Sequence, residues 1–318
     1  MNRRQAIFML GAAAAASRVH AATVAKSFTF ERGLMGTRFA ITCHHPDQKQ
    51  AEAAANDAFE EAERINQVAS DYIADSELLT LSTHPPGEAV TVSPLLFRLI
   101  SEARDLAEKT NGSFDPTLGP LTKLWRESRR RKALPDAPTL ASARAAWGWK
   151  KLILDPANRT VTFMKPAMRL DLGGIAKGQA ADAMLAMMMK HSISRSCITA
   201  GGDVRMGDPP PDANGWKIGV RTGEDSEVLV LSNCAVSTSG DLHQFIEIGG
   251  TRYSHIIDPA TGLGITRSNS ATVIAATATV SDALATACCV APGEIANSIA
   301  MKAGATEVHL SHSGLQNR

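Results

Sequence analysis

The chain has 318 residues, of which 44% are hydrophobic and 20% charged, and its formal net charge is +1. This composition is that of an ordinary globular protein, and a chain of this length can bury a sizeable core, so disordered and fibrous classes are excluded. The near-neutral charge gives no indication of binding to nucleic acid or to an acidic membrane surface.

The first 21 residues have the pattern of a signal peptide. Arg3 and Arg4 precede an uncharged, alanine-rich run, and Val-His-Ala at residues 19–21 fits a small-residue cleavage site. The paired arginines favour a twin-arginine export signal, with an ordinary secretory signal as the alternative. Without these two residues and Arg18, the chain has 30 basic and 32 acidic residues, a net charge of −2. We expect a soluble, periplasmic mature protein over 22–318, forming one domain with no membrane anchor.

The predicted elements follow from hydrophobic periodicity and from the positions of glycine and proline. Helices are expected over residues 51–68, 94–109, 175–191 and 280–290, the last being the final helix. Strands are expected over residues 27–30, 33–43 and 160–163, followed by short β segments from Cys197 onward. Residues 126–138, a basic cluster with two prolines, are predicted as an exposed loop, because a run of charges is usually solvated. Strands and helices interleave without regular βαβ alternation, which favours a mixed α/β or α+β fold over a doubly wound sheet.

Two groups of residues in these elements have an ordinary structural interpretation. The helix 175–191 carries a stripe at helical spacing that we interpret as core-facing rather than metal-binding. Its members are Ala176, Ala180, Ala183, Met184, Met187 and Met188. The five cysteines form no Cys-x-x-Cys pair, and we interpret them as buried small hydrophobic residues. They are Cys43, Cys197, Cys234, Cys288 and Cys289.

The segment "LDLGGIAKG", residues 170–178, places two glycines between a predicted strand and a predicted helix. The first N–H groups of a helix are unpaired and the helix dipole favours an anion, so this segment predicts a phosphate site. It has the spacing of neither a P-loop nor a dinucleotide fingerprint, so the motif alone does not name the ligand.

A second feature is the pair Asp282 and Thr286 in "TVSDALATA", which lie four residues apart and therefore share one face of the predicted helix. Their carboxylate and hydroxyl oxygens are hard ligands suited to Mg²⁺. The segments "AGGDVR", "STSGD" and "DPATG" are further glycine- and aspartate-rich turns, each of which could be purely structural. A phosphate turn with an oxygen-ligand pair suggests a magnesium-assisted phosphate reaction.

Eight segments, taken in order, resemble the ApbE family of FAD:protein FMN transferases. They are "LMGTRF", "SDYIADSEL", "FDPTLGPLTKLW", "LDLGGIAKG", "AGGDVR", "STSGD", "YSHIIDPATG" and "TVSDALATA". The resemblance implies an ApbE-like fold of mixed sheets flanked by helices, with a flavin cleft between two lobes. It also implies that FAD is the donor, that Mg²⁺ is required, and that FMN passes to a threonine or serine hydroxyl of an exported acceptor while AMP leaves. The acceptor is expected to be a redox or respiratory subunit.

The resemblance also assigns roles to individual residues. Gly174, through a main-chain oxygen, would bind the metal with Asp282 and Thr286. Tyr72 would stack on the isoalloxazine ring, and His255 would be the general base, with Asp258 or a metal-bound hydroxide as alternatives. The other residues expected to contact FAD are Met35, Ser113, Phe114, Asp115, Asp171, Lys177 and Ile257.

Two other functions stay open from the sequence. One is a FAD pyrophosphatase that releases FMN and AMP, and the other is a non-catalytic flavin-binding accessory protein of a respiratory complex. The chain also departs from the family pattern at residues 124–128, where it has Leu-Trp-Arg-Glu-Ser and the family often has Leu-Trp-Gly-Phe-Gly. The contacts of that segment therefore cannot be carried over.

Overall fold

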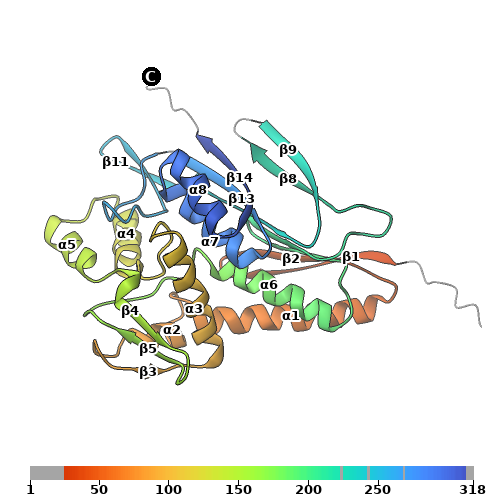
Figure 1. Ribbon diagram of the computed structural model, residues 1–318, viewed down its shortest axis with the longest axis horizontal. Coiled ribbons are helices and arrows are strands. Elements are labelled where there is room, and N and C mark those ends of the chain that lie inside the picture. Colours follow the sequence, from red (N-terminus) through yellow and green to blue (C-terminus); the bar gives the residue numbers. More distant parts are fainter. Residues whose placement is uncertain (1–24, 223–224, 242–243, 268, 313–318) are drawn as a thin grey trace, which may run out of the picture.

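The computed structural model describes residues 25–312 apart from 223–224, 242–243 and 268, so the predicted signal segment lies outside the described residues. Its centre is a seven-stranded sheet in the order β1-β2-β6-β7-β10-β13-β14, in which each neighbouring pair is antiparallel (Figure 1). The strands are β1 (Lys26–Leu34), β2 (Thr37–His45), β6 (Ser196–Ala200), β7 (Asp203–Met206), β10 (Ala235–Gly240), β13 (Asn269–Ala275) and β14 (Ala305–His312). Antiparallel pairing with helices in the connections makes this an α+β fold, which confirms the predicted class.

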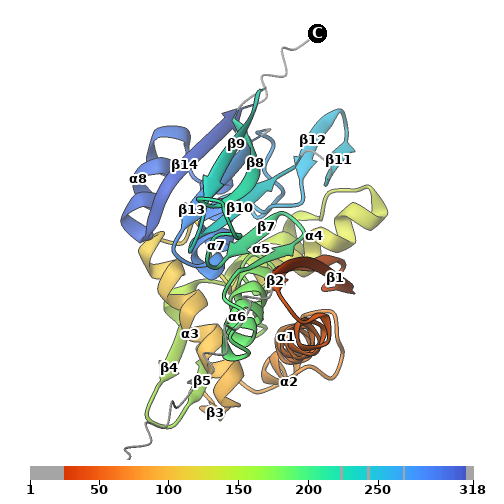
Figure 2. The same cartoon turned by 90° about the vertical axis from the view of Figure 1, so that its right-hand side faces the viewer.

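Different elements cover the two faces of this sheet, because successive side chains of a strand point to opposite sides. On β6, Ile198 and Ala200 belong to the main hydrophobic core, whereas Cys197 belongs to a smaller cluster with Trp216. The main core lies under the helices α1 (Gln48–Ala69), α6 (Ala176–Lys190) and α7 (Ala278–Val290). The smaller cluster lies under a hairpin of β8 (Trp216–Thr222) and β9 (Asp225–Leu231). Figure 2 shows α1 and α6 side by side on one side of the sheet.

The remaining elements extend this core or lie around the candidate site. They are α2 (Glu77–Leu81), β3 (Val90–Thr91), α3 (Pro94–Lys109), α4 (Gly119–Arg131), α5 (Ala137–Ala145), the 3₁₀ turn η1 (Trp149–Lys151), β4 (Leu152–Asp155), β5 (Thr160–Phe163), β11 (Phe245–Ile248), β12 (Thr251–Ser254) and α8 (Gly293–Ala303). Strands β3, β5 and β4 form a small antiparallel sheet, and β11 pairs with β12. No helix in the described part of the chain has the length and apolar character needed to cross a membrane.

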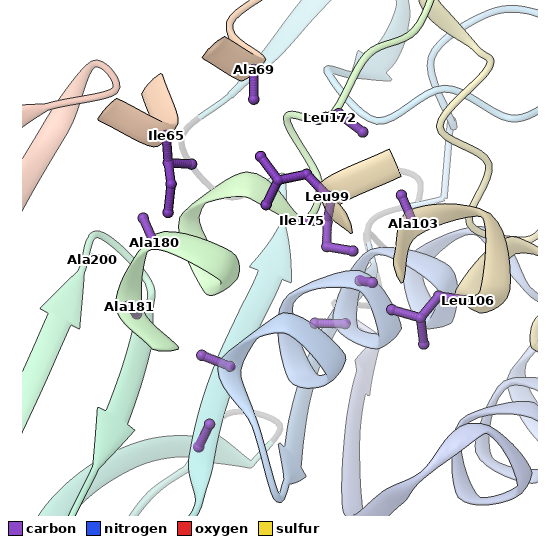
Figure 3. Packing of buried hydrophobic residues seen from close by; sticks show 14 of the residues in the cluster. Ile65, Ala69, Leu99, Ala103, Leu106, Leu172, Ile175, Ala180, Ala181 and Ala200 are labelled. Carbon is purple, nitrogen blue, oxygen red and sulfur yellow. The ribbon is translucent and has the colours of Figure 1, made fainter. Parts of the chain in front are cut away.

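Small side chains let the helices of the main core approach closely. Figure 3 shows Ile65 of α1, Leu99 of α3 and Ala180 of α6 directed into one shared hydrophobic cluster. One close approach is at Gly178 of α6, where an added Cβ would lie 2.2 Å from the carbonyl oxygen of Ala278 on α7. A side chain larger than hydrogen cannot fit there without moving a backbone. This contact fixes α7 against α6, and both helices carry residues of the candidate site.

Several predicted elements are confirmed. The four predicted helices correspond to α1, α3, α6 and α7, and α3 occupies the predicted residues 94–109. In the stripe on α6, Ala180, Met184 and Met188 are buried, and the other three members pack against the same core. The cysteines are free of disulfides, and all except the half-buried Cys234 are buried, as expected.

Four predictions are wrong. The strand expected over residues 33–43 is interrupted, because Met35 and Gly36 form the turn between β1 and β2. Residues 126–138 are not an exposed loop: α4 continues to Arg131 and α5 begins at Ala137. The side chain of Trp125 anchors α4, because it is buried and its Nε1 donates to Ser254 O at 2.9 Å. The segment "STSGD" is not a turn, since β10 extends through Gly240 and its Ser237 Oγ is hydrogen-bonded to Ser281 Oγ at 2.7 Å. Finally, α8 follows the helix that was expected to be the last.

Candidate active site

The glycine turn 171–174 leads into α6, as the sequence predicts. Asp171 holds the turn in shape, because its Oδ1 accepts a hydrogen bond from Gly173 N at 2.7 Å. Helix α6 has no side-chain N-cap, and the amide of Gly178 in its first turn donates to Asp282 Oδ2 at 3.1 Å. Asp282 therefore supplies the anion that a helix N-terminus favours, and its carboxylate is fixed next to the turn.

Lys177 lies between two buried carboxylates. Its Nζ is 3.0 Å from Asp203 Oδ2 and 3.2 Å from both oxygens of Asp282. Burial lowers the pKa of Lys177, but the two carboxylates outweigh burial and raise the pKa above its ordinary value. Burial, followed by the negative charge of Asp282, raises the pKa of Asp203 to about 6, while Lys177 opposes the rise. The single positive charge of Lys177 thus compensates the carboxylates of Asp203 and Asp282 in this buried part of the site.

Thr286 and Gly174 adjoin this cluster. Thr286 follows Asp282 by one turn on the same face of α7, and it is partly exposed while its two chain neighbours are buried. A Cβ on Gly174 would lie 3.3 Å from Thr286 Oγ1, so the backbone of Gly174 faces that hydroxyl. Ser239 Oγ of β10 also lies 3.3 Å from Thr286 Oγ1. The three residues expected to bind a metal, Gly174, Asp282 and Thr286, therefore lie together at one corner of the site.

The donor set at this corner fits Mg²⁺. A carboxylate has about four lone-pair sites, and Lys177 and Gly178 use three of those of Asp282, which leaves one for a metal. Among the described residues no three His, Cys, Asp or Glu side chains gather as a metal site. An ion here would be held by one carboxylate, the Thr286 hydroxyl and the Gly174 carbonyl, with water and substrate oxygens in the other positions. Mg²⁺ accepts such a set, since it keeps several waters.

His255 follows the last residue of β12, and its ring is oriented by the main chain. Its Nδ1 lies 3.1 Å from Gln244 O, and a carbonyl oxygen only accepts, so Nδ1 carries the proton. In the neutral ring, Nε2 therefore keeps a free lone pair. Burial lowers the pKa of His255 and the bond to Gln244 opposes this, while the charges of Arg129 and Lys177 lower the pKa further and that of Asp241 raises it. A neutral ring with an available Nε2 is the form that a general base requires.

Tyr72 lies in the loop between α1 and α2, with 76% of its surface exposed. The guanidinium of Arg126 on α4 lies 4.2 Å from the centre of its ring. The same guanidinium forms ion pairs with Asp71 and, at 3.1 Å, with Asp171. Tyr72 is thus a supported, exposed aromatic face of the kind that suits a flat apolar ring.

The other predicted residues are placed as follows. Ser113 is half-buried, and the ring of Phe114 packs near Gly174, 3.4 Å from where a Cβ would lie. Asp115 is buried, and its carboxylate accepts hydrogen bonds from Thr117 at 2.6 and 2.8 Å and from Trp149 N at 3.1 Å. Burial raises the pKa of Asp115, and these hydrogen bonds oppose the rise. These hydrogen bonds join the loop around Asp115 to the backbone of Trp149.

Two predicted flavin residues, Met35 and Ile257, pack into hydrophobic clusters. Met35 lies in the two-residue turn between β1 and β2, where it and Gly36 have φ values of 49° and 72°, as a type I′ turn requires. It packs against the main core. Ile257 is buried with Leu121 and Trp125, at the contact between α4 and the segment after His255.

Three residues of the site were not named from the sequence. In the sequence Asp203 is part of a glycine turn, and its ion pair with Lys177 depends on a strand and a helix brought together by the fold. The pairing of Asp71 with Arg126 is not visible in the sequence, because a run of basic residues is ordinarily solvated. The departure at residues 124–128 was the signal that could have directed attention to Arg126.

Comparison with known proteins identifies the family of the chain. The model of the ApbE family matches residues 35–310. The chain belongs to the ApbE family. A FAD:protein FMN transferase of Treponema pallidum is 34% identical over 258 residues, covering 75% of this chain and 71% of the relative. A FAD:protein FMN transferase of Vibrio cholerae is 32% identical over 232 residues, covering 70% of this chain and 69% of the relative.

Solved structures of this family have the same fold. The flavinyl transferase ApbE of Pseudomonas stutzeri in its apo form superposes with a TM-score of 0.80 at 25% identity, covering 89% of this chain and 90% of that chain. The ApbE protein of Thermotoga maritima superposes with a TM-score of 0.78 at 32% identity, covering 90% of this chain and 93% of that chain. Membership of the ApbE family and the α+β fold therefore rest on independent observations.

Proposed function

We propose that the protein is a magnesium-dependent FAD:protein FMN transferase, which transfers FMN from FAD to a threonine or serine hydroxyl of an acceptor protein and releases AMP. The observation that carries the proposal is the corner formed by Lys177, Asp282, Thr286 and Gly174. It combines a cation, a helix N-terminus and oxygen ligands next to a glycine turn. The relatives named FAD:protein FMN transferases support the same activity.

In this proposal the site residues divide the work of a phosphate transfer. The acceptor hydroxyl oxygen forms a bond to the phosphorus of the FMN moiety, the pyrophosphate P–O bond to AMP breaks, and AMP leaves. A hydroxyl is a weak nucleophile near neutral pH, so His255 Nε2 accepts its proton. Lys177 flanks the pyrophosphate, and its contact with Asp282 holds in place the carboxylate that would bind the metal. Mg²⁺, bound through Asp282, Thr286 and Gly174, would neutralise part of that charge.

We assign Tyr72 to the isoalloxazine ring and the segment 113–115 to the adenosine side of FAD. An exposed aromatic ring supported from one side leaves its other face free for stacking. Met35, Asp171 and Ile257 are the other residues assigned to the flavin side of the site. In this assignment Ile257 acts through its packing beneath the segment of His255.

We also infer that residues 1–21 export the chain and that the mature domain covers 22–318. Arg3 and Arg4, together with the apolar run that follows them, support a twin-arginine signal. The acceptor would then be an exported redox or respiratory protein. N-terminal sequencing of the extracytoplasmic form should find Ala22 first, and a protein confined to the cytoplasm with Met1 in place would contradict the export.

The activity is tested by incubating residues 22–318 with FAD, Mg²⁺ and exported redox proteins of the same cell. After denaturing electrophoresis, a transferase leaves a fluorescent flavin on one acceptor, and chromatography detects AMP in equal amount. Release of AMP and FMN without a labelled protein would identify a FAD pyrophosphatase instead. Flavin binding without either product would identify an accessory protein. Lys302→Met, an exposed change on α8, is the control variant that keeps full activity.

A further inference from the structure

Arg126 of α4 differs from the other arginines at the end of this helix. Arg130 and Arg131 are largely exposed and pair with Glu127 on the same helix, as expected of a solvated face. The side chain of Arg126 is 30% exposed, and it contacts three residues from two other segments. A solvated charge run does not account for these contacts.

The guanidinium of Arg126 joins two carboxylates that would otherwise repel each other. The side chains of Asp71 and Asp171 are 7% and 12% exposed, and both pair with Arg126. Burial, followed by the charge of Asp171, raises the pKa of Asp71, while Arg126 opposes the rise. The two acidic residues stay together because the planar, permanently charged guanidinium can donate to both at once.

These contacts connect Tyr72, at one end of the candidate site, to the glycine turn at the other end. On one side, the guanidinium lies 4.2 Å from the ring centre of Tyr72, within the range of a cation–π interaction. On the other side, Asp171 Oδ2 accepts from Arg126 while its Oδ1 accepts from Gly173 N. One side chain thus fixes the aromatic face relative to the glycine turn. The preceding residue, Trp125, ties the same helix to Ser254 beside His255.

We propose that Arg126 is a positioning residue for the flavin of FAD, which holds the Tyr72 ring from beneath and ties that ring to the glycine turn through Asp171. This inference rests on the proposed function, since it takes the exposed face of Tyr72 as the flavin platform. Where the family often has glycine, no side chain exists to make these contacts. The contacts of Arg126 therefore give a structural role to the departure from that pattern at position 126.

The test is a double-mutant cycle on FAD binding, in which binding is measured by the quenching of flavin fluorescence. Arg126→Met removes the charge and keeps much of the apolar stem, and we expect the Kd for FAD to rise about tenfold, with weaker quenching at saturation. In a Tyr72→Ala background the same change should raise the Kd less than threefold, because the platform is already absent. Arg126→Lys keeps the charge but not the planar fork, and it should fall between the wild type and Arg126→Met.

Arg130→Met is the matched control, on the next turn of the same helix, and it should leave both readouts unchanged. Equal affinity and equal quenching in Arg126→Met and Arg130→Met would overturn the inference, as would the same loss of affinity with and without Tyr72. If Arg126→Met does not fold, Arg126→Lys decides by the same two readouts. Absence of FAD binding by the wild type would overturn the proposed function and this inference together, whereas wild-type binding with unaffected variants overturns this inference alone.

Discussion

Lys177 Nζ lies 3.2 Å from both carboxylate oxygens of Asp282, which comes 105 residues later in the chain. The pair joins the first turn of α6 to the face of α7 that also carries Thr286. Because Asp203 lies 3.0 Å from the same Nζ, the ammonium compensates two buried negative charges.

Lys177→Met should destabilise the protein by about 3–5 kcal/mol at pH 8, because it leaves two buried carboxylates without a cation. The loss should shrink at pH 5. With Lys177 present, the raised pKa of Asp203, about 6, means that the folded state binds a proton more readily than the unfolded state, so this contribution to stability is present at low pH and is lost as pH rises. Removing Lys177 raises this pKa further, so at pH 5 Asp203 is protonated and no longer needs a cation. Urea unfolding at both pH values measures the difference. Lys302→Met is the control, and an effect independent of pH would contradict the account.

Thr286→Val removes the hydroxyl from the proposed Mg²⁺ site while keeping the size of the side chain. The Mg²⁺ concentration for half-maximal transfer should rise about tenfold or more, since one of three protein ligands is lost. Thr286→Ser keeps the hydroxyl and should stay within a few-fold of the wild type. Transfer rates over a Mg²⁺ titration provide the measurement, and undiminished transfer in excess chelator would disprove the metal assignment.

The residues that the sequence could identify are those with a local pattern. Helix α3 begins where Ser93, as N-cap, accepts a hydrogen bond from Leu96 N, and Pro94 occupies the first turn, where proline is tolerated. Asp282 and Thr286 are neighbours on a helix face by spacing alone. The glycine turn before α6 likewise shows its character in the sequence, so the core of the candidate site was predictable.

The residues that the sequence could not identify depend on partners far along the chain. Helix α4 is held by the hydrogen bond from Trp125 to Ser254, which is 129 residues away, and by the ion pairs of Arg126. Its run of basic residues gives no hint of either contact. Asp203 is similar, because a glycine-rich turn between two strands does not reveal that a lysine from another helix will pair with it. Tertiary contacts, rather than local propensity, decide these positions.

Gly178→Ala should destabilise the protein by about 1–3 kcal/mol and reduce activity, because the added methyl overlaps the backbone of α7. The new Cβ would lie 2.2 Å from Ala278 O, so the helices must separate and carry Lys177 away from Asp282. Gly33→Ala in β1 is the matched control, since a Cβ there meets nothing within 4 Å. Denaturant unfolding of both variants makes the comparison, and equal stabilities would show that α6 and α7 do not constrain each other at this point.

The last prediction separates catalysis by His255 from a merely structural role. Since Nδ1 donates to Gln244 O, Nε2 is the atom that would accept the acceptor proton. His255→Ala should lower transfer by ~10²–10⁴-fold, the range for general acid–base catalysis, and leave the affinity for FAD nearly unchanged. Parallel losses of rate and affinity would instead assign His255 to flavin binding or packing, and wild-type turnover at saturating FAD would exclude it from the reaction.

The pH profile gives this prediction a second measurement. A base must be unprotonated, so transfer should fall as pH drops through the pKa of His255 and level off above it. Burial, together with the charges of Arg129 and Lys177, lowers this pKa. The acidic limb of the pH profile, over which transfer falls, should therefore lie below ~6.5, the ordinary histidine value. Arg129→Gln removes one of these charges and should move the limb toward higher pH, without abolishing transfer. His255→Ala should lose the limb entirely, and an unchanged limb in that variant would transfer the role of base to another group, such as Asp258.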